Sequence, residues 1–198
     1  MTAGDEAGPG GSYGERGPGK AAGCDAGIGA DGPVVTIIVD GANVVGSRPD
    51  GWWRDRAGAA VRLHDELAKL AARGATGIPA ELLATAGGEQ PAVPPGPDGD
   101  PSGLVKVRVI LVLEGAARAA GPRIAERARR AEGGRVRAAD AGTVQVVSAP
   151  GSGDDEIVRQ ARSCAGCCIV VTADRELRRR CLAAGARVAG PSWLYALL

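Results

Sequence analysis

The first strongly patterned stretch of the chain is an apolar run over residues 34–39, VVTIIV. Its length and its β-branched residues are typical of a strand that is buried on both faces. The run stops at Asp40, and Gly41 and Asn43 follow, so the chain turns and leaves two polar side chains beyond the strand end. We therefore expect a central strand with Asp40 and Asn43 at the sheet edge where ligands bind in open α/β folds.

Further strands and helices alternate along the rest of the chain. Apolar runs predict strands over residues 105–113, 144–147, 167–171 and 186–189. Apolar positions three and four apart, with capping and stop residues, predict helices over residues 54–73, 122–131, from Ser152 onward, 175–184 and 191–198. Right-handed crossovers between such strands predict a three-layer α/β/α sandwich with a mostly parallel, five-stranded Rossmann-like sheet.

Two segments do not fit this alternation. Residues 1–33 and 74–103 are rich in Gly, Ala and Pro, and the whole chain has 32 Gly, 13 Pro and no Phe. Such segments cannot bury enough apolar surface to offset the entropy of ordering them. The prediction is a disordered tail over 1–33 and a domain over 34–198 that carries a flexible insertion at 74–103.

The net charge of +1 conceals an uneven distribution. Tail and insertion together contain nine acidic and two basic residues, so the remainder contains 22 basic and 14 acidic residues. A basic domain suits a polyanionic partner such as RNA, although a solvated, arginine-rich surface is an alternative. With neither an apolar N-terminal segment nor 18 consecutive apolar residues, the chain is expected to be cytoplasmic and without membrane contact.

The five cysteines do not form a metal-site pattern. Cys164 and Cys167 match a CxxC motif, but no second pair completes a zinc site and His64 is the only histidine. Cys167 and Cys168 open the apolar run CCIVV, so they are expected to be small buried strand residues.

Acidic residues follow four of the predicted strands. Since parallel strands end at one edge of the sheet, these side chains should lie near one another: Asp40, Glu114, Asp154, Asp155 and Asp174. Grouped carboxylates repel one another unless a cation compensates, and Mg²⁺ or Mn²⁺ prefers such oxygen ligands. Taken singly, Asp154, Asp155 or Asp174 could instead cap a helix and Glu114 could pair with Arg118, whereas Asp40 precedes no predicted helix.

The motifs VDGANVVG at 39–46, SGDDEIV at 152–158 and VVTADRELR at 170–178 resemble the NYN domain family, the YacP-like branch of the PIN-like nuclease superfamily. The resemblance covers residues 34 to about 191 without the insertion, and it implies a metal-dependent ribonuclease with a Rossmann-like sheet. By position it assigns metal-site aspartates to Asp40, Asp154 and Asp174, and a neighbouring polar residue to Asn43. Glu114 stands where YacP-like proteins usually have aspartate, and Asp155 lies beside a motif position, as an accessory ligand or a cap.

These observations together predict a metal-dependent ribonuclease. Asp40, Asp154 and Asp174 would hold Mg²⁺ or Mn²⁺, with Glu114 at the side and Asn43 orienting Asp40 or the attacking water. A single-stranded or looped RNA would be held through its phosphates by arginines: Arg48, Arg118, Arg175, Arg178 and Arg179. Trp52 and Trp53 could stack on a base or simply cover the edge of the core.

Two other functions compete with this one. The first is a non-catalytic RNA-binding module of the same fold, in which the arginines bind RNA but the acids do not retain a metal. The second is a small-molecule phosphohydrolase, which is disfavoured because Asp40-Gly-Ala-Asn lacks a DxD nucleophile motif and the arginines exceed what a mononucleotide requires. A dinucleotide-binding role lacks the GxGxxG motif after the first strand.

Overall fold

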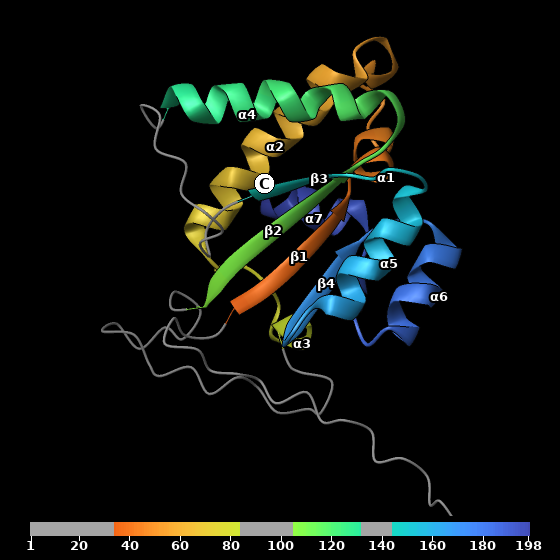
Figure 1. Cartoon of the computed structure of the whole chain (residues 1–198). Helices are drawn as coiled ribbons and strands as arrows, with labels where there is room; N and C mark the ends of the chain where they lie inside the picture. Colours follow the sequence, from red (N-terminus) through yellow and green to blue (C-terminus); the bar gives the residue numbers. More distant parts are fainter. Residues whose placement is uncertain (1–33, 84–104, 132–143) are drawn as a thin grey trace, which may run out of the picture.

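A computed structural model describes residues 34–83, 105–131 and 144–198 of the chain (Figure 1). Five parallel strands form one sheet in the order β3-β2-β1-β4-β5. The strands are β1 (Val34–Asp40), β2 (Lys106–Leu113), β3 (Val144–Ser148), β4 (Cys167–Val171) and β5 (Arg187–Ala189). The predicted five-stranded parallel sheet is thus confirmed. The predicted tail lies outside the described residues.

The strand order places β1 at the centre of the sheet. From β1 the chain moves outward through β2 to β3, and then returns to the other side of β1 to form β4 and β5. Asp40 is in register with Val112 of β2, and Val39 is in register with Val171 of β4. The carboxyl ends of β1, β2 and β4 therefore lie level, at the point where the order reverses and where such sheets bind ligands.

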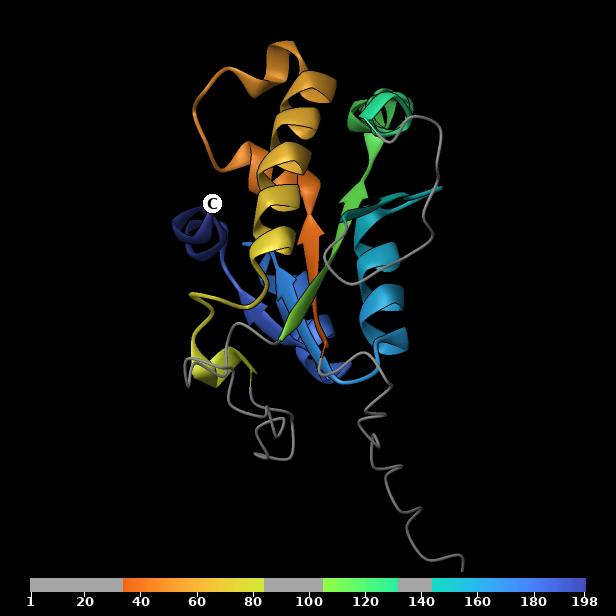
Figure 2. The same ribbon diagram turned by 90° about the vertical axis from the view of Figure 1, so that its left-hand side faces the viewer.

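Helices cover both faces of the sheet, as the views in Figures 1 and 2 show. Helices α2 (Arg56–Arg73), α4 (Ala120–Ala131) and α7 (Pro191–Leu197) pack on one face, where Ile37 and Leu67 are fully buried. Helices α5 (Gly153–Ser163) and α6 (Arg175–Ala183) cover the other, where Ile38 and Leu177 are fully buried. Because alternate residues of each strand enter different layers, the inner strands are continuously apolar over residues 37–39 and 109–113, which confirms the three-layer sandwich.

Three short helices that lie outside residues 74–103 were not predicted. Helix α1 (Gly41–Gly46) follows β1 directly, and the 3-10 helices η1 (Trp52–Arg54) and η3 (Gly115–Ala119) precede α2 and α4. Helix α1 lies very close to β2, because a Cβ added at Gly41 would be 2.7 Å from the carbonyl oxygen of Val112. A residue without a side chain is therefore required at this turn.

The first ten residues of the segment that the composition assigned to a flexible insertion are packed against the core. Ala75 and Ile78 are buried, and the amide of Ala75 donates a hydrogen bond to the carbonyl of Val105 at 3.1 Å. A short helix, α3 (Ala80–Leu83), follows, and its two leucines pack against the core. Residues 74–83 thus belong to the packed structure, because a few apolar residues suffice to anchor them. Residues 84–103 lie outside the described residues.

Helix α2 begins at Arg56, after Asp55, whose carboxylate accepts a hydrogen bond from the amide of Gly58 at 2.8 Å. Cys167 and Cys168 are buried in β4, as predicted from their place in an apolar run. Among the residues that the structure describes, no helix is long and apolar enough to cross a membrane.

Candidate active site

Asp40 is the most deeply placed acid at the carboxyl edge of the sheet, with 8% of its surface exposed. It is the N-cap of α1, and its Oδ1 accepts a hydrogen bond from the amide of Asn43 at 3.1 Å. The expectation that Asp40 precedes no helix is therefore wrong, because the six-residue helix GANVVG was too short to show a helical period. Asn43 orients Asp40 as predicted, but through its backbone amide.

Thr172 connects Asp40 to the segment that follows β4, and its role was not predicted from the sequence. This fully buried residue donates a hydrogen bond from Oγ1 to Oδ2 of Asp40 at 2.9 Å. Oγ1 of Thr172 also accepts a hydrogen bond from the amide of Asp174 at 3.1 Å. The sequence signal that could have indicated Thr172 was its position, between the apolar run at 167–171 and Asp174.

Asn43 makes a second connection between the segments that follow β1 and β4. Its side-chain Oδ1 accepts a hydrogen bond from the amide of Ala173 at 3.0 Å. Asp174 itself caps α6, since its Oδ1 accepts a hydrogen bond from the amide of Leu177 at 2.7 Å. The ends of β1 and β4 are thus held together by side chains from both, and each keeps an acid at the edge.

Glu114 reaches across to the start of α5. Its Oε2 accepts a hydrogen bond from the amide of Gly153 at 2.9 Å, and a Cβ at that glycine would be 2.6 Å from the same oxygen. Ser152 is the N-cap residue of α5 but makes no side-chain capping bond. The alternative, an ion pair between Glu114 and Arg118, does not form in the described part of the chain. Arg118 instead donates to the carbonyl oxygens of Gly115 and Ala149.

Asp154 and Asp155 differ although they are neighbours. Asp155 is exposed and forms an ion pair with Arg180 of α6, with 2.6 Å between Oδ1 and Nη2. Asp154 is half-buried, and within the described part of the chain its carboxylate accepts no hydrogen bond. Asp154 is therefore the acid with both oxygens available, and Asp155 is drawn toward α6.

The acids act on one another electrostatically. Burial raises the pKa of Asp40 above its ordinary value, the hydrogen bonds from Asn43 and Thr172 partly offset this, and the charges of Asp154 and Glu114 raise it further. Burial also raises the pKa of Asp154, with contributions from Asp174 and Glu114. Four carboxylates from four separate segments thus share one electrostatic environment, as expected from parallel strands that end at one edge.

The resemblance implies a divalent metal, and the donor set can be tested against it. Across residues 34–83, 105–131 and 144–198, no three acidic, cysteine or histidine side chains are close enough to hold one ion together. Mg²⁺ and Mn²⁺, however, are commonly bound by one or two carboxylates, with water and substrate phosphate completing the shell. The carboxyl groups of Asp40 and Asp154, whose pKa values are raised by burial and by neighbouring charges, fit such an ion. The predicted arrangement, in which three carboxylates hold one ion, does not form among the described residues.

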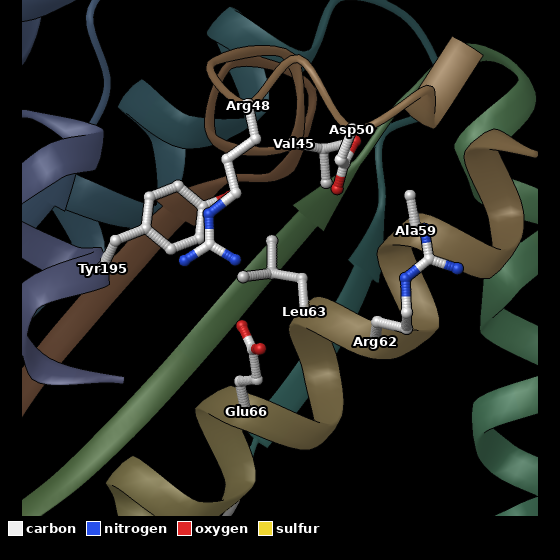
Figure 3. Close-up of a pocket in the computed structure, with 8 residues that line it drawn as sticks. All are labelled: Val45, Arg48, Asp50, Ala59, Arg62, Leu63, Glu66 and Tyr195. Carbon is white, nitrogen blue, oxygen red and sulfur yellow. The ribbon is translucent and has the colours of Figure 1, made fainter.

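Arg48 lies on the far side of α1 from Asp40, in the loop before η1. Its guanidinium carbon is 3.3 Å from the centroid of the Tyr195 ring, and Tyr195 donates a hydrogen bond from Oη to the carbonyl of Val44 at 2.9 Å. Figure 3 shows this pair at the side of a cavity of about 170 Å³ that Arg62 and Glu66 also line. Arg48 is thus engaged in a stacking contact.

The predicted RNA-binding arginines of α6 differ in whether their guanidinium groups already have a partner. Arg179 is paired with Glu176 of its own helix, with 2.6 Å between Nη2 and Oε1. Arg175 and Arg178 lie in the first turn of α6, beside Asp174, and in the described residues neither forms an ion pair or a hydrogen bond through its side chain. Arg175 and Arg178 are therefore the predicted cations that remain available to a ligand at this edge.

No protein-family model matches the sequence, and no curated protein matches it. Among solved structures, the crystal structure of a mutant of Rae1 (YacP) from Bacillus subtilis is similar, with 17% sequence identity and a TM-score of 0.43. The similarity covers 81% of this chain and 72% of the Rae1 chain.

Proposed function

We propose that this protein is a metal-dependent ribonuclease of the YacP-like branch of the NYN family, which hydrolyses RNA phosphodiester bonds in the cytoplasm. The observation that supports this is that neighbouring carboxylates add to burial in raising two pKa values. Asp154 and Glu114 raise the pKa of Asp40, and Asp174 and Glu114 raise the pKa of Asp154. Four acids that gather where a parallel sheet reverses its strand order are suited to a divalent cation and an anionic substrate.

Bound Mg²⁺ or Mn²⁺ would lower the pKa of a water and offset the charge that develops on the phosphodiester. Asp154 would hold the ion directly, since both of its oxygens are available. Asp40 and Asp174 would hold it directly or through water, each with the carboxylate fixed by a backbone amide. Glu114 would contribute from the side while it caps α5.

The remaining groups would orient the substrate. With Oδ1 of Asn43 occupied by the amide of Ala173, its NH₂ group is left to donate to a phosphate oxygen or to the attacking water. Arg175 and Arg178 would contact neighbouring phosphates, which adds affinity but little sequence preference. A single-stranded or looped RNA can follow this open edge more closely than a duplex can.

The test is cleavage of a labelled oligoribonucleotide with Mn²⁺, with Mg²⁺ and with EDTA. Wild type is expected to cut only with a divalent ion, and Asp154→Asn and Asp174→Asn should each lower the rate at least tenfold. Asp155→Asn, whose carboxylate pairs with Arg180, is the matched control and should retain most of the activity. If both variants cut as fast as wild type, these acids do not have the proposed roles.

A non-catalytic RNA-binding module is the second candidate, and one observation favours it. Glu114 and Asp174 already accept hydrogen bonds from backbone amides at helix starts, which are structural roles that need no metal. RNA binding without cleavage in any divalent ion would support this candidate. A small-molecule phosphohydrolase would instead release phosphate from free nucleotides in a parallel substrate panel.

A further inference from the structure

A second cavity, of about 380 Å³, opens directly beside the acidic edge. Its walls come from the start of α1, from η1 and the start of α2, and from η3. The residues that give it its chemistry are Trp52, Arg56, Glu114 and the backbone of Gly115. Its volume is within the range typical of small-molecule sites, and one of its walls is an acid of the candidate active site.

Trp52 forms an aromatic wall that is already fixed in place. Its backbone amide donates a hydrogen bond to Asp50 at 3.1 Å, and its ring lies against Gly46, where an added Cβ would be 3.6 Å from Cζ2. The guanidinium of Arg56 is 5.3 Å from the centroid of the ring. Trp53 meets Trp52 edge to face at 6.3 Å and is 55% exposed. A partly exposed aromatic ring beside a cavity offers a face on which a flat ring can stack.

We propose that this cavity is a nucleobase subsite, in which Trp52 stacks on a base of the RNA strand whose phosphate lies at the acidic edge. The identity of the strand as RNA rests on the proposed function. A base is flat and apolar on its faces but polar at its rim, and the cavity matches both features. Trp52 supplies the face, while Arg56 and Glu114 supply a donor and an acceptor for the rim.

The cavity beside Arg48 provides a contrast. It is smaller, about 170 Å³, and it is lined by charges of both signs, with the Arg48 guanidinium already stacked on Tyr195 (Figure 3). In the cavity beside Glu114 the contact is looser, because the Arg56 guanidinium carbon is 5.3 Å from the centroid of the Trp52 ring, against 3.3 Å for Arg48 and Tyr195. Val45 of α1 lines both cavities, and the one beside Trp52 is also lined by Glu114 of the candidate active site. This difference in contact distance and position selects the Trp52 cavity as the base site.

The test uses the full chain in EDTA, so that binding is measured without cleavage. In the double variant Trp53→Phe, Trp193→Phe, the remaining tryptophan is Trp52. A short single-stranded oligoribonucleotide should quench its fluorescence, and an abasic oligomer of equal length and charge should quench it far less. Equal quenching by both oligomers, or none by either, would overturn the proposal, and quenching only by an apolar peptide would assign the cavity to a protein partner instead.

A variant series measures the energetic contribution. Trp52→Leu should weaken binding of the oligoribonucleotide about 5- to 100-fold, because base stacking on an aromatic ring contributes an effect of this size. Trp52→Tyr should restore most of the affinity, whereas a merely structural role would respond to loss of bulk and not to recovery of an aromatic face. Trp52→Tyr binding no better than Trp52→Leu contradicts the proposal.

The outcome is separable from that of the proposed function. If wild type binds RNA through Trp52 but never cleaves it with Mn²⁺ or Mg²⁺, the ribonuclease proposal fails and the base subsite stands. If wild type cleaves and Trp52→Leu changes neither affinity nor rate, the base subsite fails and the ribonuclease proposal stands.

Discussion

Thr172 is the residue on which the geometry of the acidic edge depends most, since its hydroxyl serves Asp40 and Asp174 at once. Thr172→Val preserves shape but removes both bonds, and it should lower the free energy of unfolding by about 1–3 kcal/mol, because it leaves buried groups unpaired. It should also raise the pKa of Asp40, since the lost hydrogen bond lowered it. The acid limb of the cleavage rate should therefore move to higher pH.

Urea denaturation and a pH–rate profile measure the two effects. Thr172→Ser keeps the hydroxyl and is the control, for which both quantities should stay close to wild type. A valine variant with an unshifted acid limb would show that Thr172 does not tune Asp40.

Asp40 carries a buried charge and also caps a helix, and two substitutions separate these roles. Because burial raises its folded-state pKa above the ordinary 3.8, the stability that the protonated form provides is present below that value and is lost as the pH rises through the folded pKa. Asp40→Asn keeps the cap without the charge. The stability of Asp40→Asn relative to wild type should therefore increase as the pH rises from 3.8 through the folded-state pKa of Asp40. It should remain higher at pH 7, even though activity is lost.

Asp40→Ala removes charge and cap together, so it should be about 1 kcal/mol less stable than Asp40→Asn at every pH. Urea titrations of the three proteins at acidic and neutral pH measure these differences. A constant difference between wild type and Asp40→Asn across the pH range would mean that the carboxylate is not penalised by burial.

Among the cysteines that the structure describes, Cys164 should react first with an alkylating reagent. A hydrogen bond with the Cys168 thiol, with further help from Thr36 and Arg108, lowers the pKa of Cys164 to about 6. Burial raises the pKa of Cys181 to about 11. Labelling by iodoacetamide, followed by mass spectrometry, should find Cys164 modified at pH 7 and Cys181 unmodified.

Cys168→Ala should slow labelling of Cys164 at pH 7, because it removes the main cause of the lowered pKa. Cys168→Ser, whose hydroxyl can still donate, is the matched control and should slow it less. Labelling that is equally fast in all three proteins contradicts this explanation.

At the scale of elements, the turn from β1 into α1 decides how close the acids come to one another. Gly41→Ala would bring a Cβ to 2.7 Å from the backbone oxygen of Val112, which cannot move without disturbing β2. The variant should lose about 1–3 kcal/mol of stability, as overpacked sites do. Gly46→Ala, at the other end of the same helix, meets nothing nearer than 3.6 Å and should be close to neutral. Thermal unfolding of both compares them, and equal melting temperatures would contradict the close approach.

The positions of some elements were predictable from the sequence, and those of others were not. The inner strands were clear because a strand buried on both faces has an uninterrupted apolar run, as 34–39 does. Helix α1 was missed because six residues with a glycine at each end show no helical period. The bond between Glu114 and Gly153 joins residues 39 positions apart, and only the folded sheet brings them together. The sequence thus predicted which acids reach the edge, but not which oxygens the helix starts would occupy.

At the scale of the whole molecule, the excess of basic residues outside the tail and the insertion should make RNA binding strongly dependent on salt. Arg175→Gln with Arg178→Gln should reduce the slope of log K against log salt by about 1.4, since each phosphate contact on a single strand contributes about 0.7.

Lys69 and Arg162 are exposed near the last turns of α2 and α5, at the opposite edge of the sheet, so Lys69→Gln with Arg162→Gln is the charge-matched control. Fluorescence anisotropy at several salt concentrations measures both slopes. Equal slopes for the two double variants would mean that net charge, and not this edge, attracts RNA.

Asp40, Asp174 and Glu114 each bind the first amides of a helix as well as facing the proposed substrate. Chemistry and architecture therefore share the same atoms at this end of the molecule. A lineage that abandoned the reaction would still be under pressure to retain these acids so that the helices stay anchored. The presence of these acids in a relative is consequently weaker evidence of catalysis than the presence of Asp154, whose carboxylate accepts no hydrogen bond from the described residues.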